Sequence, residues 1–137
     1  MDKQIINPPT LPAPRGYNHG ILVSGGRLLF LAGQDASDIE GNIVAPGDLV
    51  AQFEQVLRNL QAVVEEAGGT VQDIVKLNIF VRDRDDYAAK LRPLGQVFRE
   101  YFDGHYPAMA LFEVAGFFRA ETLVELEGFA VIPEPGE

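Results

Sequence analysis

The sequence predicts an α+β fold in which two helices cover one face of a mixed β-sheet. Apolar residues recur at three- and four-residue spacing between residues 50 and 64, which is typical of an amphipathic helix. Runs rich in valine, isoleucine, leucine and phenylalanine lie on both sides of that helix, and such runs favour strands. The predicted order is β-β-α-β-α-β-β. At 137 residues we expect one domain, residues 1–137, with an ordered core of about residues 13–132.

The first predicted elements are an extended arm and a β-hairpin. Residues 6–20 are rich in proline, which disfavours a helix and indicates an arm. Two apolar runs follow within residues 21–34, and Gly25 and Gly26 lie where the runs meet. Because glycine readily adopts the positive φ that tight turns require, the pattern predicts that the two runs pair as a hairpin. Residues 35–48 then indicate a loop.

The first helix has clear signals at both ends. Asp48 precedes the periodic segment and has a side chain that can cap a helix N-terminus. Gly68 and Gly69 follow the segment, and glycine commonly ends a helix. Residues 74–83 then alternate mainly β-branched and apolar side chains, which predicts a strand.

The C-terminal half is predicted to contain one more helix and two more strands. The helix runs from residue 85 or 86 to about residue 102, and Pro93 inside it implies either a kink or a fresh helix start. The strands are residues 108–118 and 122–132. We expect the tail, residues 133–137, to be loose.

Three of the predicted strands carry apolar side chains on both faces: residues 27–34, 108–118 and 122–132. A sheet face of this kind is usually covered by helices or by another polypeptide rather than by water. Two helices can cover only one face. We therefore expect a second subunit to cover the other face.

Composition excludes several classes of function. The formal net charge is −9 and the basic residues are scattered, whereas a nucleic-acid binder needs a concentrated cationic surface. The chain has no cysteine, which excludes disulfides and thiolate metal sites. No apolar run approaches the ~20 residues of a membrane helix. The N-terminus lacks the pattern of a secretion signal, so we expect a cytoplasmic protein with no membrane or nucleic-acid partner.

Few side chains suggest catalysis by themselves. His19 and His105 have no close metal-binding partner in sequence, and both are expected in turns or at strand edges, with no metal site. Glu125 and Glu127 are two residues apart in a predicted strand, so they lie on the same face. That face is either solvated or holds a carboxylate that positions water or a proton.

Seven short motifs follow one another in a specific order: GYNHG, LFLAGQ, QFEQVLRNLQAVVEEAGG, DIVKLNIFVRD, REYF, YPA and LVELEGFAV. In these motifs the chain resembles the RidA family, also called the YjgF family, from about residue 13 to residue 132. The resemblance implies the chorismate-mutase-like fold and a homotrimer whose sheets surround a central barrel. It also implies a small-molecule ligand cleft at each subunit interface.

The resemblance further implies an activity. Active members hydrolyse reactive imines and enamines, which releases ammonia and a 2-keto acid, and they use no cofactor. A glutamate of the last strand is thought to orient the attacking water, and Glu125 matches it. Tyr17 matches a cleft tyrosine near the N-terminus, and Gly33 matches the glycine of an SGQ-like turn whose backbone amide faces the substrate.

Other positions depart from the family pattern. Met109 stands directly after the Pro-Ala pair, where active members have the arginine that binds the substrate carboxylate. Gly95 falls at the position of a helix asparagine, and Leu111 at the position of a cysteine found in many active members. A thioether cannot hold a carboxylate, so the chain resembles the arginine-lacking members. Arg119 is a candidate replacement cation.

Two functions remain open on this evidence. The first is a cofactor-free deaminase-type hydrolase of altered specificity, in which Glu125 activates water and Tyr17 and Gly33 position the substrate. In this case hydrolysis of standard 2-imino acids is expected to be weak or absent. The second is a non-catalytic trimer that binds a small metabolite or a protein partner. The family names also include translation inhibitor and endoribonuclease, but the net charge of −9 disfavours a role with RNA.

Overall fold

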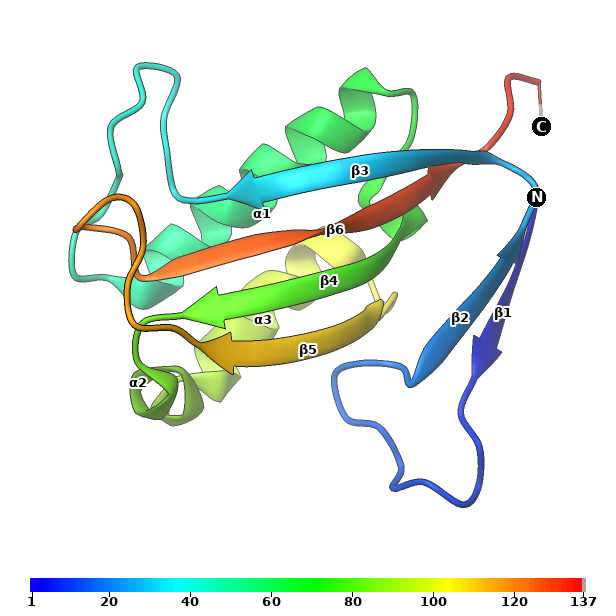
Figure 1. The fold of residues 1–137 in the computed structure, drawn as a ribbon, viewed down its shortest axis with the longest axis horizontal. Coiled ribbons are helices and arrows are strands. Elements are labelled where there is room, and N and C mark those ends of the chain that lie inside the picture. The colour runs from blue at the N-terminus through cyan, green and yellow to red at the C-terminus, as the bar shows by residue number, and fades with distance from the viewer. Residues whose placement is uncertain (137) are drawn as a thin grey trace.

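A four-stranded mixed sheet forms the centre of the molecule, and the helices cover one of its faces (Figure 1). The computed structural model describes residues 1–136. The sheet has the order β3-β6-β4-β5, in which only the β4–β5 pair is parallel. Its strands are β3 (Arg27–Gln34), β4 (Ile74–Val81), β5 (Ala108–Glu113) and β6 (Val124–Ile132). The predicted α+β architecture is therefore confirmed.

The predicted hairpin of residues 21–34 is wrong, because the two strands belong to different sheets. β2 (Gly20–Ser24) pairs with a strand that the sequence did not indicate, β1 (Asp2–Ile6), and the two form a separate ribbon. β3 instead pairs antiparallel with β6. Gly25 and Gly26 have φ values of 79° and 82°, so the expected turn is present. It redirects the chain from the ribbon into the central sheet (Figure 1).

Helix α1 (Leu49–Glu66) has the predicted ends. The Asp48 carboxylate accepts a hydrogen bond from the Ala51 amide at 3.0 Å, which satisfies one of the free donors of the first turn. Gly68 follows the helix with φ of 91°, a conformation that favours glycine. The apolar stripe of α1 packs on the sheet and is fully buried at Phe53, Val56, Leu57, Leu60 and Val64.

The second predicted helix is divided in two. Helix α2 (Arg84–Ala89) ends at Lys90, whose φ of −119° and ψ of 23° are not helical, and α3 (Leu91–Phe102) begins directly after it. Pro93 lies in the first turn of α3, where its missing amide hydrogen costs little. Pro93 therefore marks a fresh start rather than a kink. Phe98 and Phe102 stack with ring centroids 4.1 Å apart and are buried against the rest of the core.

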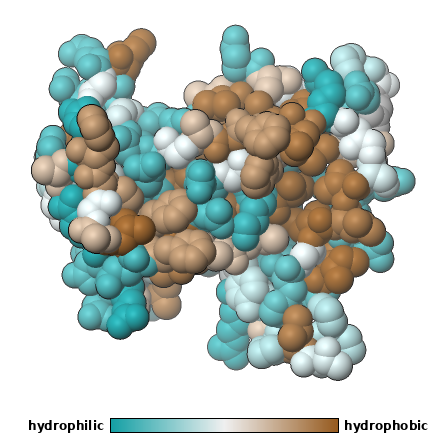
Figure 2. Space-filling model, in the orientation of Figure 1, coloured by the Kyte–Doolittle hydropathy of each residue, from teal (hydrophilic) through white to brown (hydrophobic). Residues whose placement is uncertain are grey.

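The sheet face opposite the helices is apolar and open. Leu28, Phe30 and Phe112 are 59%, 70% and 47% exposed, and the Phe30 and Phe129 rings meet edge-on at 5.3 Å. Figure 2 views this face and shows apolar side chains gathered over β3. The predicted strand of residues 108–118 is shorter than expected, because β5 ends at Glu113 and a loop leads to β6. Within residues 1–136, no helix is long and apolar enough to cross a membrane.

Candidate functional site

A cavity of about 500 Å³ lies between α3, β5 and the loop that precedes β2. Four residues singled out from the sequence line it together: Tyr17, Gly95, Met109 and Leu111. Much of the remaining lining is apolar or aromatic and comes from α1, β4, α2, α3 and the connection before β5: Phe53, Ile79, Tyr87, Leu91, Leu94, Phe98 and Tyr106. The volume is suited to a small organic molecule.

Strand β5 contributes Met109 and Leu111 to the wall of this cavity. Met109 lies opposite Leu77 of β4, and Leu111 lies opposite Ile79, in the parallel register of the two strands. Leu77 and Ile79 are buried on the helix side of the sheet. Because side chains of neighbouring strands at one register position share a face, Met109 and Leu111 also face the helices.

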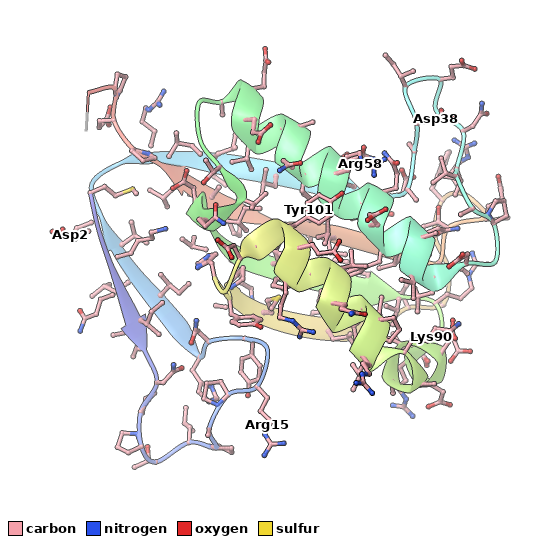
Figure 3. All side chains as sticks on the ribbon, turned by 180° about the vertical axis from the view of Figure 1, so that it is seen from behind. Asp2, Arg15, Asp38, Arg58, Lys90 and Tyr101 are labelled. Carbon is pink, nitrogen blue, oxygen red and sulfur yellow. The ribbon has the colours of Figure 1, made fainter. Side chains whose placement is uncertain are left out.

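The loop that carries Tyr17 is held against the start of β5 by Asn18. The Asn18 amide donates to the Pro107 carbonyl at 3.1 Å, and its side-chain Nδ2 donates to the Tyr106 carbonyl at 2.6 Å. The Tyr17 ring also meets the His19 ring edge-on at 5.3 Å. These contacts fix Tyr17 at the cavity. Figure 3 shows the same loop from the helix side, with Arg15 on it below α3.

The two histidines serve the backbone rather than the cavity. His19 Nε2 lies 2.7 Å from the Pro12 carbonyl oxygen, and His105 Nε2 lies 2.6 Å from that of Ile74. Burial lowers the pKa of His105, although its hydrogen bond to Ile74 acts in the opposite direction. Among residues 1–136, no group of three or more histidine, aspartate or glutamate side chains could hold a metal ion.

Glu125 and Gly33 meet on the other face of the sheet. Glu125 lies opposite Phe80 of β4, one register position away from the buried Val81 and Ile79, so it points away from the helices. The register of β3 shifts by one residue between Leu31 and Gln34, and Gly33 lies in this irregularity. A Cβ atom at position 33 would collide with Oε1 of Glu125. A larger residue at position 33 would therefore require the Glu125 carboxylate to move from its present position.

The Glu125 carboxyl group holds its proton more tightly than an ordinary glutamate. Burial raises its pKa, and the negative charges of Asp35 and Glu127 raise it further. A carboxyl group with a raised pKa can exchange a proton with water or substrate closer to neutral pH. This property is consistent with a general acid or base, and it is the clearest electrostatic signal at this face.

The cations near the cavity are not the one suggested by the sequence. Arg119 donates from Nη1 to the Gly41 carbonyl at 2.8 Å and does not line the cavity. Arg15 and Arg99 line it instead. Neither arginine was predicted from the sequence. The spacing of Gly95 and Arg99 on a predicted helix could have indicated that they share a face.

One chain thus carries two separate groups of candidate residues. The cavity holds Tyr17, Gly95, Met109 and Leu111 on the helix side of the sheet. Glu125 and Gly33 lie on the open side. A single chain cannot bring the Glu125 carboxylate to a ligand beside Met109, because the sheet lies between them.

Sequence and structure comparisons identify the family. The family model described as endoribonuclease L-PSP matches residues 9–132. A RutC family protein of Pyrococcus abyssi is 34% identical over 131 residues, which are 95% of this chain and 98% of the relative. A 2-iminobutanoate/2-iminopropanoate deaminase of Dermatophagoides farinae is 33% identical over 131 residues, which are 95% of this chain and 97% of that protein.

Solved structures show the same fold. A protein of unknown function of the conserved Rid protein family from Yersinia pestis matches with a TM-score of 0.86 at 34% identity, covering 96% of this chain and 100% of that chain. The YjgF gene product of E. coli matches with a TM-score of 0.65 at 32% identity, covering 90% and 91%. The chain therefore belongs to the endoribonuclease L-PSP family, which is the RidA/YjgF family that its sequence motifs indicated.

Proposed function

We propose that this protein is a cofactor-free hydrolase of the deaminase type, which acts on small imines or enamines with a specificity different from that of standard 2-imino acid deaminases. The observation that carries the proposal is the Glu125 carboxyl group with its raised pKa, held against Gly33 on the open face of the sheet. A deaminase of 2-iminobutanoate and 2-iminopropanoate is among the relatives. Imine hydrolysis needs one group that activates water and a cleft that holds the substrate beside it.

The working site in this proposal forms between two copies of the chain. The cavity beside Met109 and the Glu125 carboxylate lie on opposite sides of one sheet, so the open face of one copy must approach the cavity of the next. Exposed apolar residues of β3 support such packing. In a single copy, Leu28 is 59% exposed to water and Phe30 is 70% exposed. A closed ring of three copies, with the sheets around a central barrel, repeats this contact three times.

Each candidate residue has a role in this cleft. Glu125 orients the attacking water and accepts its proton, while Tyr17 and the Gly33 amide position the substrate. Met109 and Leu111 supply an apolar wall where active family members are expected to bind a carboxylate, and this supports our proposal that the chain belongs to an arginine-lacking subfamily. An apolar wall favours substrates that carry a hydrocarbon group at this position.

A second candidate function is a non-catalytic trimer that binds a small metabolite. The lining of the cavity favours this function. Three positions that are polar in the family pattern carry an apolar side chain or no side chain here: Met109, Leu111 and Gly95. In this case Glu125 and Glu127 serve only the structure or the polarity of the ligand site. Cleavage of RNA is disfavoured for either assembly, because a net charge of −9 repels the phosphate backbone.

Replacing Phe30 by glutamate is expected to dissociate the trimer. Phe30 is 70% exposed on the apolar face, and in an assembly its replacement would bury an unpaired charge. Sedimentation equilibrium at micromolar concentration should give a trimer for the wild type and a monomer for Phe30→Glu. Ile39→Glu is the matched control, because Ile39 is fully exposed at a loop tip away from the sheet. A folded wild-type monomer would contradict the assembly.

The wild-type protein is expected to hydrolyse 2-iminobutyrate and 2-iminopropionate at rates little above the uncatalysed reaction. The reason is that Met109 offers no cation to hold the carboxylate beside the activated water. A coupled assay of keto-acid release measures this, and a panel of imines with larger hydrocarbon groups should contain better substrates. Glu125→Gln should abolish turnover of every imine that the wild type accepts. If no imine is hydrolysed, the non-catalytic function is the better one.

A further inference from the structure

The guanidinium of Arg99 lies over Gly95 at the wall of the cavity. The two residues are one helical turn apart on α3, and a Cβ atom at position 95 would come within 3.3 Å of Arg99 Nη1. A Cβ atom at position 95 would require the guanidinium to shift by a few tenths of an ångström. The absence of a side chain at this position therefore leaves space for the Arg99 head group, and both residues line the cavity.

The charge of Arg99 has no partner among residues 1–136. Within residues 1–136, neither a salt bridge nor a side-chain hydrogen bond engages the guanidinium. An arginine used for stability usually pairs with a carboxylate, and this chain has 20 acidic residues available. The five donors of Arg99 are thus left for solvent or for a ligand.

The charge of the lining contrasts with the charge of the whole protein. The net charge of the chain is −9, yet within residues 1–136 of a single copy the cavity is lined by two arginines, Arg15 and Arg99, and by no acidic residue. A cation-lined hollow with apolar walls concentrates the field and attracts anions.

We propose that the cavity binds small acids with an apolar body, and that Arg99 of α3 binds their carboxylate in place of the missing strand arginine. A guanidinium can hold both carboxylate oxygens through two parallel hydrogen bonds. Arg15, on the loop at the mouth, adds to the positive field. Met109, Leu111 and Phe98 contact the hydrocarbon part, and Tyr17 also lines the cavity.

The position of the anchor predicts which acids fit. The cation stands on α3, across the cavity from Met109 on β5, so a bound carboxylate lies on the helix side. In a 2-imino acid the reacting carbon is directly bonded to the carboxylate and would stay on that side. In a longer acid the reacting carbon lies several bonds away and can reach across the cavity. The binding of acids through Arg99 does not depend on the proposed hydrolysis. Only the placement of the reacting carbon rests on the proposed function.

Binding of 4-phenylbutanoate, measured by isothermal titration calorimetry at low salt, tests the inference. We expect the wild type to bind the acid and to bind the neutral 4-phenylbutanamide more weakly. Arg99→Gln should raise the dissociation constant of the acid about tenfold or more, and leave that of the amide nearly unchanged, because charge-assisted bonds are the stronger ones. Arg99→Lys should recover only part of the affinity, since lysine lacks the planar fork.

Arg92→Gln is the matched control, because Arg92 is an exposed arginine of the same helix that does not line the cavity. It should bind the acid as the wild type does. Arg99 is exposed and unpaired, so its replacement should leave the fold and the assembly intact, which circular dichroism and sedimentation can verify. Failure of the wild type to bind the acid, equal affinity for acid and amide, or unchanged affinity in Arg99→Gln would overturn the inference.

The outcomes also separate this inference from the proposed hydrolase. If imines are hydrolysed but the acid binds independently of Arg99, the anchor is wrong and the hydrolase stands. If the acid binds through Arg99 and no imine is hydrolysed by any variant, the anchor stands and the hydrolase is wrong.

Discussion

Replacing Gly128 by alanine is expected to lower the free energy of unfolding by about 3 kcal/mol or more, because a Cβ atom there collides with the backbone of the neighbouring strand. Gly128 lies in the middle of β6, between β3 and β4. The added atom would overlap the Lys76 carbonyl oxygen and come within 2.8 Å of the Lys76 carbonyl carbon and 3.1 Å of Leu77 Cα. The register of β4 shifts between Ile74 and Lys76, and this irregularity directs the Lys76 carbonyl toward the glycine.

No rearrangement of a flexible side chain relieves this collision, because the obstructing atoms are main-chain atoms of a buried strand. Urea unfolding followed by circular dichroism should show a lower midpoint with an unchanged slope. Gly116→Ala is the matched control, since a Cβ atom at position 116 meets nothing within 4 Å. A Gly128→Ala variant as stable as the wild type would show that β4 and β6 pair differently in solution.

The helices could be predicted from the sequence because their signals are local. Asp48 precedes a periodic apolar segment and caps α1, and Pro93 was expected either to kink a helix or to begin one. The structure decides between the two, because α3 begins two residues before Pro93. Capping and proline geometry depend on residues within one turn, so a short window of sequence contains most of the information.

Strand pairing could not be predicted in the same way. Gly25 and Gly26 form the turn that the sequence indicated, yet β2 and β3 on either side do not pair with each other. β3 pairs with β6, which is about 100 residues later in the chain and is inserted between β3 and β4. A hairpin signal reports the turn, whereas the partner of each strand depends on burial of the whole sheet.

The candidate site was predicted in part. The positions of Tyr17, Gly95, Met109 and Leu111 came from the resemblance, and these residues do line one cavity. The sequence did not indicate that Glu125 lies on the opposite face of the sheet from the cavity. Its orientation depends on the pairing register of β4 and β6, which a single sequence does not specify. Arg99 was missed because the resemblance drew attention to a cation near position 109 in sequence, whereas this arginine approaches from a helix.

Met109→Arg is expected to confer hydrolysis of 2-iminobutyrate, with an increase of about tenfold or more over the wild type, because positioning of the reacting group is a large part of such catalysis. Met109 faces the cavity from β5, and an arginine has the length to present its guanidinium there. The gain should vanish in Met109→Arg combined with Glu125→Gln, because an amide cannot accept a proton from water. Met109→Gln, which adds polarity without charge, should show no gain. The coupled keto-acid assay measures all of these variants.

The same substitution should weaken the fold. Met109 is half-buried and packs against the core, so a guanidinium there loses water and also faces the charge of Arg99 across the cavity. We expect a loss of about 1–2 kcal/mol, which is typical of a polar group that is buried without a partner. Combining Met109→Arg with Arg99→Gln removes the repulsion between the two guanidinium groups and should restore part of the stability. Addition of 2-ketobutyrate should raise the melting temperature of Met109→Arg, because the ligand binds the folded state. A Met109→Arg protein that is folded and trimeric but neither binds 2-ketobutyrate nor hydrolyses the imine would favour the non-catalytic function, since the cleft would then lack more than its carboxylate anchor.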